Sequence, residues 1–171
     1  MLEELEKINK KVKSSVKSSN LKYYYGRFLP STDFMFVAER PTVPKNSNDW
    51  DPTNNFYLSN SDINFVNLLN KYGLGGSYIT DIVKSCGPSG DKLSKKDVDL
   101  YFPLLLEEIK VLKPKIIVAM SQKAESILVD KFIIHKIKIP IVRVFHPSYV
   151  QRYGKRQEYE KQIQNLTHQT N

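Results

Sequence analysis

The chain has 171 residues, and its 26 Lys and Arg against 18 Asp and Glu give a formal net charge of +8. This length favours one compact domain that can bury a hydrophobic core. The single Cys excludes an internal disulfide and the thiolate set of an iron–sulfur cluster. No apolar run reaches the ~20 residues of a membrane span, and the acidic N-terminus is unlike a signal peptide. We therefore expect a soluble, cytoplasmic protein with no membrane association.

Positive charge is concentrated at the two ends of the chain. Residues 1–30 and 131–171 are both strongly basic, whereas the middle of the chain is slightly acidic. This pattern predicts a basic face built by the termini, and a polyanion partner with nucleic acid as the first choice. A basic surface that serves only solubility is the alternative.

In chain order, residues 1–19 have the spacing of a Lys-rich amphipathic helix, which with a connector makes an N-terminal segment over 1–29. Within 30–171, short apolar runs alternate with helical patterns. The runs occupy 34–39, 77–83, 115–120 and 139–146, and the helical patterns occupy 61–72, 94–112, 121–131 and 154–167. Asp62, Ser94 and Ser121 are expected N-caps, and Gly73 an expected helix end. The alternation predicts an α/β fold, a three-layer α/β/α sandwich around a mostly parallel four-stranded sheet.

Polar side chains stand at the end of each predicted strand. Glu39 follows the first run, Asp81 lies near the end of the second, Ser121 follows the third and His146 ends the fourth. Each of them also has an ordinary structural explanation, such as an ion pair or a bond to a nearby amide. Because ligands of open α/β sheets bind outside the carboxyl ends of the strands, we expect these residues to share one functional edge.

Five segments, taken in order, resemble the uracil-DNA glycosylase superfamily, and especially its small iron–sulfur-containing branch. FVAERP (36–41) is similar to the G-E-x-P-G motif, and HPSY (146–149) matches the H-P-S motif. The other three segments are NFYLSNSDINFVNLL (55–69), YITDIVKS (78–85) and LLLEEIKVLKPKIIVAMSQKAESIL (104–128). The resemblance covers about residues 30–165, which is nearly the whole chain.

This resemblance implies a DNA glycosylase that flips a nucleotide and hydrolyses the N-glycosidic bond of uracil or a modified pyrimidine, without metal or cofactor. Glu39 would activate or orient the attacking water, and His146 would bond the base carbonyl as negative charge develops on the leaving group. The base would lie against Phe56, Asp81 and Ala38. The residues implied to contact DNA, with a wedge that fills the gap left by the flipped nucleotide, are Lys84, Ser121, Ser148, Tyr149, Val150, Arg152 and Tyr153.

Several residues depart from the pattern of the family. Ala38 replaces a Gly before Glu39, and Ser85 stands where the related branch has a cluster cysteine, so Cys86 is expected to be an ordinary buried thiol. Asp81 stands where the family has a base-reading Asn. An ionised Asp offers only acceptors, which disfavours the O4 carbonyl of uracil and suits the exocyclic amine of a cytosine derivative.

Two other classes of function remain open. The first is a catalytically silent member of the same fold that binds DNA or a protein, and the second is an enzyme acting on a free nucleoside or nucleotide. The presence of both Glu39 and His146 favours a glycosylase, and the basic termini favour DNA over a small molecule. His135 and His168 lack metal-ligand spacing, so we expect no metal. We also expect the protein to be a monomer that is associated with the nucleoid.

Overall fold

The computed structural model of the chain describes residues 1–16, 22–27, 33–43, 50–56, 59–87 and 93–169. Its centre is a four-stranded sheet in the order β2-β1-β3-β4, and all three strand pairings are parallel. The strands are β1 (Phe34–Ala38), β2 (Tyr78–Asp81), β3 (Ile116–Ala119) and β4 (Ile141–Arg143). The predicted α/β fold with a parallel four-stranded sheet is confirmed, and each strand is shorter than the apolar run that predicted it.

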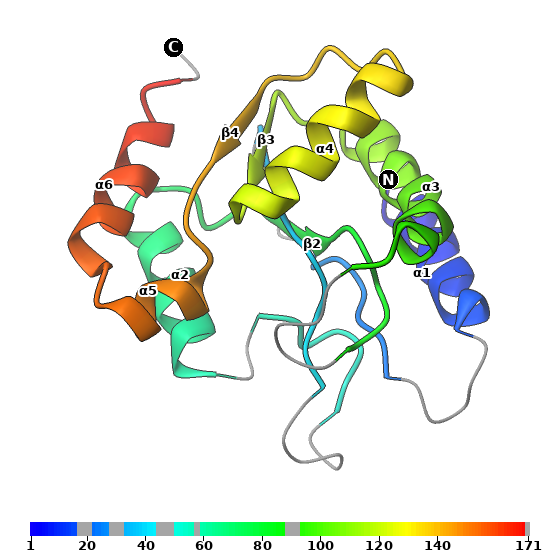
Figure 1. Ribbon diagram of the computed structural model, residues 1–171, viewed down its shortest axis with the longest axis horizontal. Helices are drawn as coiled ribbons and strands as arrows, with labels where there is room; N and C mark the ends of the chain where they lie inside the picture. The colour runs from blue at the N-terminus through cyan, green and yellow to red at the C-terminus, as the bar shows by residue number, and fades with distance from the viewer. Residues whose placement is uncertain (17–21, 28–32, 44–49, 57–58, 88–92, 170–171) are drawn as a thin grey trace.

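Helices cover both faces of this sheet (Figure 1). On one face, α1 (Leu2–Ser15), α3 (Lys95–Leu112) and α4 (Gln122–Ile134) bury residues in a common core cluster with the strands. On the other face, α2 (Asn60–Lys71) and α6 (Arg156–Leu166) do the same, and the short α5 (Pro147–Tyr153) lies beside them. The layers are those of an α/β/α sandwich.

The ends of the helices largely follow local sequence signals. Ser94 and Ser121 are N-caps, as predicted, and each accepts a hydrogen bond from a backbone N–H of the first turn. The prediction for Asp62 is wrong by three residues, because Ser59 caps α2 and Asp62 completes a capping box with it. Gly73 lies two residues beyond α2 with φ +71°, a left-handed conformation that glycine adopts without strain.

The strand order creates a switch point between β1 and β3. The chain leaves β1 through α2 toward β2 and leaves β3 through α4 toward β4, so these neighbouring strands send their connections in opposite directions. In open parallel sheets, the crevice outside the carboxyl ends of such strands is the usual ligand site. Glu39 and Ser121 are the first polar residues beyond these two strand ends.

The two basic ends of the chain lie on opposite faces of the sheet (Figure 1). At the N-terminal end, α1 packs on α3, with Leu5, Ile8 and Val12 buried and Lys11 paired to Glu107. At the C-terminal end, α6 packs on α2. The expected single basic face built by both termini is therefore wrong, and the predicted boundary between 29 and 30 lies outside the described residues. Within the described ranges, no helix is both long enough and apolar enough to span a bilayer.

Candidate active site

Glu39 is the first residue beyond β1, at the switch point of the sheet. The Ser121 hydroxyl donates a hydrogen bond to Glu39 Oε1 at 2.7 Å, and Lys123 Nζ lies 3.3 Å from Oε2. Ser121 Oγ also accepts from the Ala124 N–H at 2.9 Å as the N-cap of α4. Since a hydroxyl has one proton to donate, the cap fixes Ser121 so that this proton points at the carboxylate.

His146 is the N-cap of α5 and faces the same edge. Its Nδ1 accepts from the Ser148 N–H at 3.2 Å and lies 2.8 Å from Ser148 Oγ, while Pro147 supplies the favourable first residue of the helix. Burial lowers the pKa of His146, and the nearby Asp62 and Glu39 carboxylates oppose this effect. The ring is therefore neutral near pH 7, and with Nδ1 used as an acceptor its proton lies on Nε2.

Phe56 brings an aromatic ring beside this histidine. The ring centroids of Phe56 and His146 are 6.3 Å apart, and Phe56 also packs on Phe65 at 6.1 Å. Its φ of +62° puts a bulky side chain in the left-handed region, which is strained and is held only where the surroundings require it. Phe56 is buried, and its contact with Phe65 holds the ring beside His146.

Asp81 ends β2 in register with Ala38 of β1, and its side chain is 2% exposed. Asn55 Nδ2 donates to Asp81 Oδ2 at 2.5 Å, whereas the buried Oδ1 has no hydrogen-bond partner among the described residues. Burial raises the pKa of Asp81 to about 7, although the Asn55 hydrogen bond and the Lys84 charge both oppose the rise. Sequence patterns gave no sign of Asn55, because an Asn before an aromatic carries no local signal of this contact.

Lys84 is buried and paired inside the protein, which argues against the prediction that it contacts DNA. Its side chain is 1% exposed, and its Nζ lies 2.7 Å from Glu108 Oε2 and 2.5 Å from Thr80 Oγ1. Tyr78 donates a further hydrogen bond to Glu108 at 3.2 Å. The lysine completes a buried polar cluster between β2 and α3, which we call the Lys84–Glu108 cluster.

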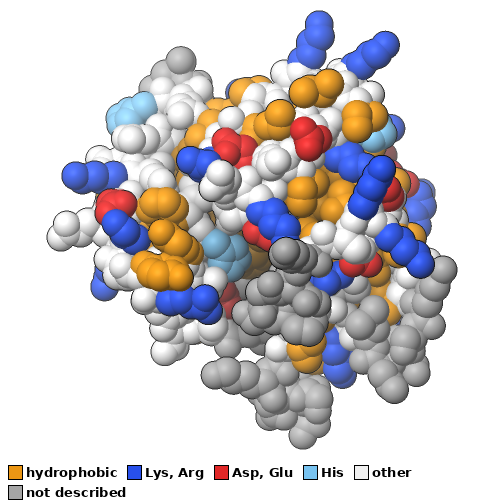
Figure 2. All heavy atoms as spheres, viewed as in Figure 1, with side chains coloured by type: hydrophobic (Ala, Val, Ile, Leu, Met, Phe, Trp, Pro, Cys, Tyr) orange, Lys and Arg blue, Asp and Glu red, His pale blue; other side chains and the backbone are white. Residues whose placement is uncertain are grey.

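The residues after His146 that are implied to contact DNA fold as the short helix α5. Tyr149 and Tyr153 lie one turn apart with ring centroids 4.6 Å apart, and they are 41% and 58% exposed. Ser148 and Arg152 are also exposed, whereas Val150 packs against the core cluster beneath the helix. Figure 2 shows hydrophobic side chains gathered over α5 beside Lys and Arg side chains. The apolar surface that this helix offers is therefore formed by the tyrosines, not by Val150.

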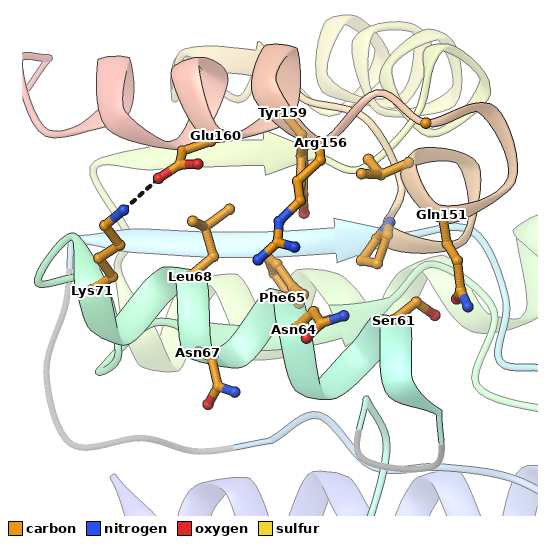
Figure 3. Close-up of a pocket in the computed structure, with 13 residues that line it drawn as sticks. Ser61, Asn64, Phe65, Asn67, Leu68, Lys71, Gln151, Arg156, Tyr159 and Glu160 are labelled. Carbon is orange, nitrogen blue, oxygen red and sulfur yellow. Dashed lines mark hydrogen bonds and ion pairs between the residues drawn. The ribbon is translucent and has the colours of Figure 1, made fainter.

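A pocket of about 470 Å³ opens between α2 and the α5–α6 segment (Figure 3). Phe65, Leu68 and Val150 give it an apolar lining, and Arg156 and Gln151 extend toward α2. The Lys71–Glu160 ion pair at 2.5 Å bridges α2 and α6 at one end. None of Glu39, Asp81 and His146 lines this pocket, which adjoins the candidate site through Pro147, next to His146, and through Phe65, which packs on Phe56.

The one cysteine of the chain supplies no reactive thiol near neutral pH. Cys86 is buried, as expected, and burial raises the pKa of its thiol to about 12, which makes it unreactive near neutral pH. In the part of the chain that the structure describes, no group of three or more His, Cys, Asp and Glu side chains is arranged to hold a metal ion.

Comparison with known proteins agrees with this fold. The uracil DNA glycosylase superfamily model matches residues 25–167, and the chain belongs to this family. A search of curated proteins gave no match. Among solved structures, the chain is similar to wild-type Pedobacter heparinus SMUG2, with a TM-score of 0.53 and 14% identity over 94% of this chain and 96% of that one. At this identity the structural likeness shows the shared fold, and the family supports a DNA glycosylase-type function.

Proposed function

We propose that this protein is a monomeric DNA base glycosylase that flips a pyrimidine nucleotide and hydrolyses its N-glycosidic bond. The observation that carries the proposal is that two groups lie at the same edge of the sheet. They are Glu39, which Ser121 holds at the switch point, and a neutral His146. Base excision in DNA repair follows from membership of the family. Such an enzyme would work in the cytoplasm at the nucleoid.

Glu39 supplies the negative charge that the reaction needs at the sugar. Glycosidic cleavage passes through an oxocarbenium-like transition state, which a nearby carboxylate stabilises, and the same carboxylate can orient the attacking water. Ser121 fixes Oε1, and Lys123 is placed 3.3 Å from Oε2 on the exposed side. Ser121 would thus act as a positioning residue through Glu39, and its DNA contact stays a prediction.

His146 acts at the leaving group. As the bond breaks, negative charge develops on the departing base, and the neutral ring can donate its Nε2 proton in a hydrogen bond to a base carbonyl oxygen. The Ser148 N–H and hydroxyl hold Nδ1, so the ring cannot rotate freely when the substrate binds. A protonated histidine is not required.

Residues around these two groups would bind the flipped nucleotide. The Phe56 ring, which lies beside His146, would stack on the base, with Asp81 and the backbone of Ala38 at the edge of the base. Tyr149 and Tyr153 offer the apolar surface that can fill the gap in the duplex, and Ser148 and Arg152 can contact phosphates.

The test is base release from oligonucleotides that each carry one modified or mismatched pyrimidine, followed by alkali cleavage of the abasic sites. Release from at least one substrate is expected. Glu39→Gln and His146→Ala should each slow release by about 10²-fold or more while leaving DNA affinity unchanged. Glu107→Gln, which removes an ion-paired surface carboxylate on α3, is the matched control and should retain full activity. Equal loss of binding and release in Glu39→Gln and His146→Ala would contradict the catalytic assignment.

A catalytically silent DNA-binding protein is the second candidate. It is favoured by the burial of Asn55, Phe56 and Asp81, which are only 6%, 6% and 2% exposed. In the described structure these side chains leave Asp81 little surface for a base to contact. DNA binding without release of any base in the panel would favour this candidate over the glycosylase.

A further inference from the structure

The two oxygens of the Asp81 carboxyl group lie in different environments. Oδ2 accepts from Asn55 Nδ2, and the orientation of that amide is fixed because Asn55 Oδ1 accepts from the Phe56 N–H at 3.2 Å. Oδ1 is buried and has no hydrogen-bond partner within the described ranges. Only Oδ1 is left to bond a group that enters the site.

The charges around Asp81 give little stabilisation to its ionised form. The nearby cation of Lys84 is already paired with Glu108, and the carboxylates of Glu108 and Asp62 disfavour a further negative charge. The Cys86 thiol is neutral, and among the described residues Asn55 supplies the only direct donor. A buried carboxyl with one neutral donor gains little from ionising, and burial accordingly raises the pKa of Asp81 to about 7. Both forms are populated near neutral pH.

We propose that Asp81 selects the base through its own protonation state, using Oδ1 as a single reading atom. With a proton on Oδ1, the group donates to the carbonyl at position 4 of a uracil-type base. Without it, the same atom accepts from the exocyclic amine of a cytosine-type base. This inference rests on the proposed glycosylase function and extends it to the choice of substrate.

The contact with Asn55 explains how one residue can read both kinds of base. A free carboxylate facing cytosine would place its second oxygen against the ring N3, which is also an acceptor. Here that oxygen is held by Asn55 and is turned to the protein. The sequence predicted that Asp81 disfavours uracil when it is ionised. Because burial raises the pKa of Asp81 to about 7, the change between its neutral and ionised forms falls near physiological pH.

The experiment compares native protein with Asp81→Asn on a single oligonucleotide that contains uracil. The measured quantity is the kcat/KM of native protein divided by that of the variant, between about pH 5 and pH 9. Groups shared by the two proteins, such as Glu39 and His146, cancel in this ratio. The amide in the variant is a constant donor, so the ratio should be level at low pH and fall by about tenfold per pH unit above pH 7. On an oligonucleotide with cytosine in place of uracil, the ratio should instead rise with pH.

A second variant keeps the inference independent of one substitution. Asn55→Leu removes the donor to Oδ2, which destabilises the ionised form, so the fall in the uracil ratio should move to higher pH. Thermal unfolding checks that the variant folds. An infrared difference spectrum of native protein minus Asp81→Asn should show a protonated carboxyl band that disappears as pH rises through neutrality.

Each outcome decides one of the two proposals. Uracil release with a ratio that stays flat from pH 5 to pH 9 overturns the role of Asp81 and leaves the glycosylase function standing. A carboxyl band that does not titrate in this range overturns it as well, without reference to turnover. Release of no base from any oligonucleotide overturns the proposed function itself.

Discussion

Thr80 and Asp81 are neighbours on β2, but their side chains belong to two polar regions with opposite character. Thr80 joins the Lys84–Glu108 cluster under α3, where Glu108 has Lys84, Thr80 and Tyr78 as partners. Asp81 faces the other layer, with Asn55 as its one donor and Oδ1 unbonded within the described ranges. The alternation of side chains along a strand separates them. A buried carboxyl group whose oxygens are all hydrogen-bonded usually has a structural role. A buried carboxyl group with an unbonded oxygen is suited to bind a ligand.

The largest expected effect comes from breaking the satisfied region. Lys84→Met leaves Glu108 buried without its cation and should lower the free energy of unfolding by about 3–5 kcal/mol. The double variant Lys84→Met with Glu108→Gln removes both charges and should recover much of this loss. Urea unfolding monitored by circular dichroism measures both. A loss below about 1 kcal/mol in the single variant would mean that the ion pair is not buried as described.

The Asp81 region predicts that replacing its carboxyl group with an amide increases the stability of the protein. The pKa of Asp81 is about 7 in the folded protein against an ordinary value of 3.8, so the native state holds its proton more tightly than the unfolded chain. The stability that this tighter proton binding contributes is fully present below about pH 4. It is lost as pH rises through 7, which lowers the free energy of unfolding by up to about 4 kcal/mol. Asp81→Asn does not titrate and should be more stable than native protein at pH 8.

The control for this prediction is pH itself. The difference between Asp81→Asn and native protein in thermal unfolding should shrink steadily toward pH 4, where both side chains are neutral. A difference that stays constant across this range would show that Asp81 is ionised throughout, and would place it with Glu108 as a satisfied structural acid.

A comparison of two helix-capping serines tests whether Ser121 supports catalysis at the switch point in addition to capping α4. Ser121 and Ser94 cap α4 and α3 in the same way, but only Ser121 also bonds Glu39. Each Ser→Ala change should cost about 1 kcal/mol of stability. Ser121→Ala should in addition slow base release by about tenfold, since it removes a hydrogen bond to a charged group. Equal turnover in Ser121→Ala and Ser94→Ala would show that Ser121 only caps α4.

The sequence predicted the parts of the molecule that depend on local pattern. The apolar runs gave all four strands, and parallel order followed because helices separate them. Strand-end logic placed Glu39 and Ser121 at one edge, where the structure has them in contact at 2.7 Å. These features are set by periodicity and by topology, which can be read along one chain.

What the sequence did not predict depends on contacts between distant segments. The Lys84–Glu108 bond joins residues of β2 and α3 regions, and a lysine in a family motif resembles a DNA contact until its burial is known. Asn55 reaches Asp81 across 26 positions. The opposite placement of the two basic ends likewise follows from which face each terminal helix covers, and charge counts carry no such information.

The smallest effect concerns which basic end binds DNA. Arg152 on α5 lies beside the candidate site, whereas Lys7 on α1 covers the opposite face of the sheet. Each phosphate contact contributes about −0.9 to the slope of log affinity against log salt concentration for duplex DNA. Arg152→Gln should therefore make the slope shallower by about one unit, and Lys7→Gln, which removes the same charge, should leave it unchanged. Fluorescence anisotropy with a labelled duplex at several salt concentrations measures both slopes. Equal reductions would show that DNA responds to net charge alone, and a change in Lys7→Gln only would move the DNA-binding surface to α1 and away from His146.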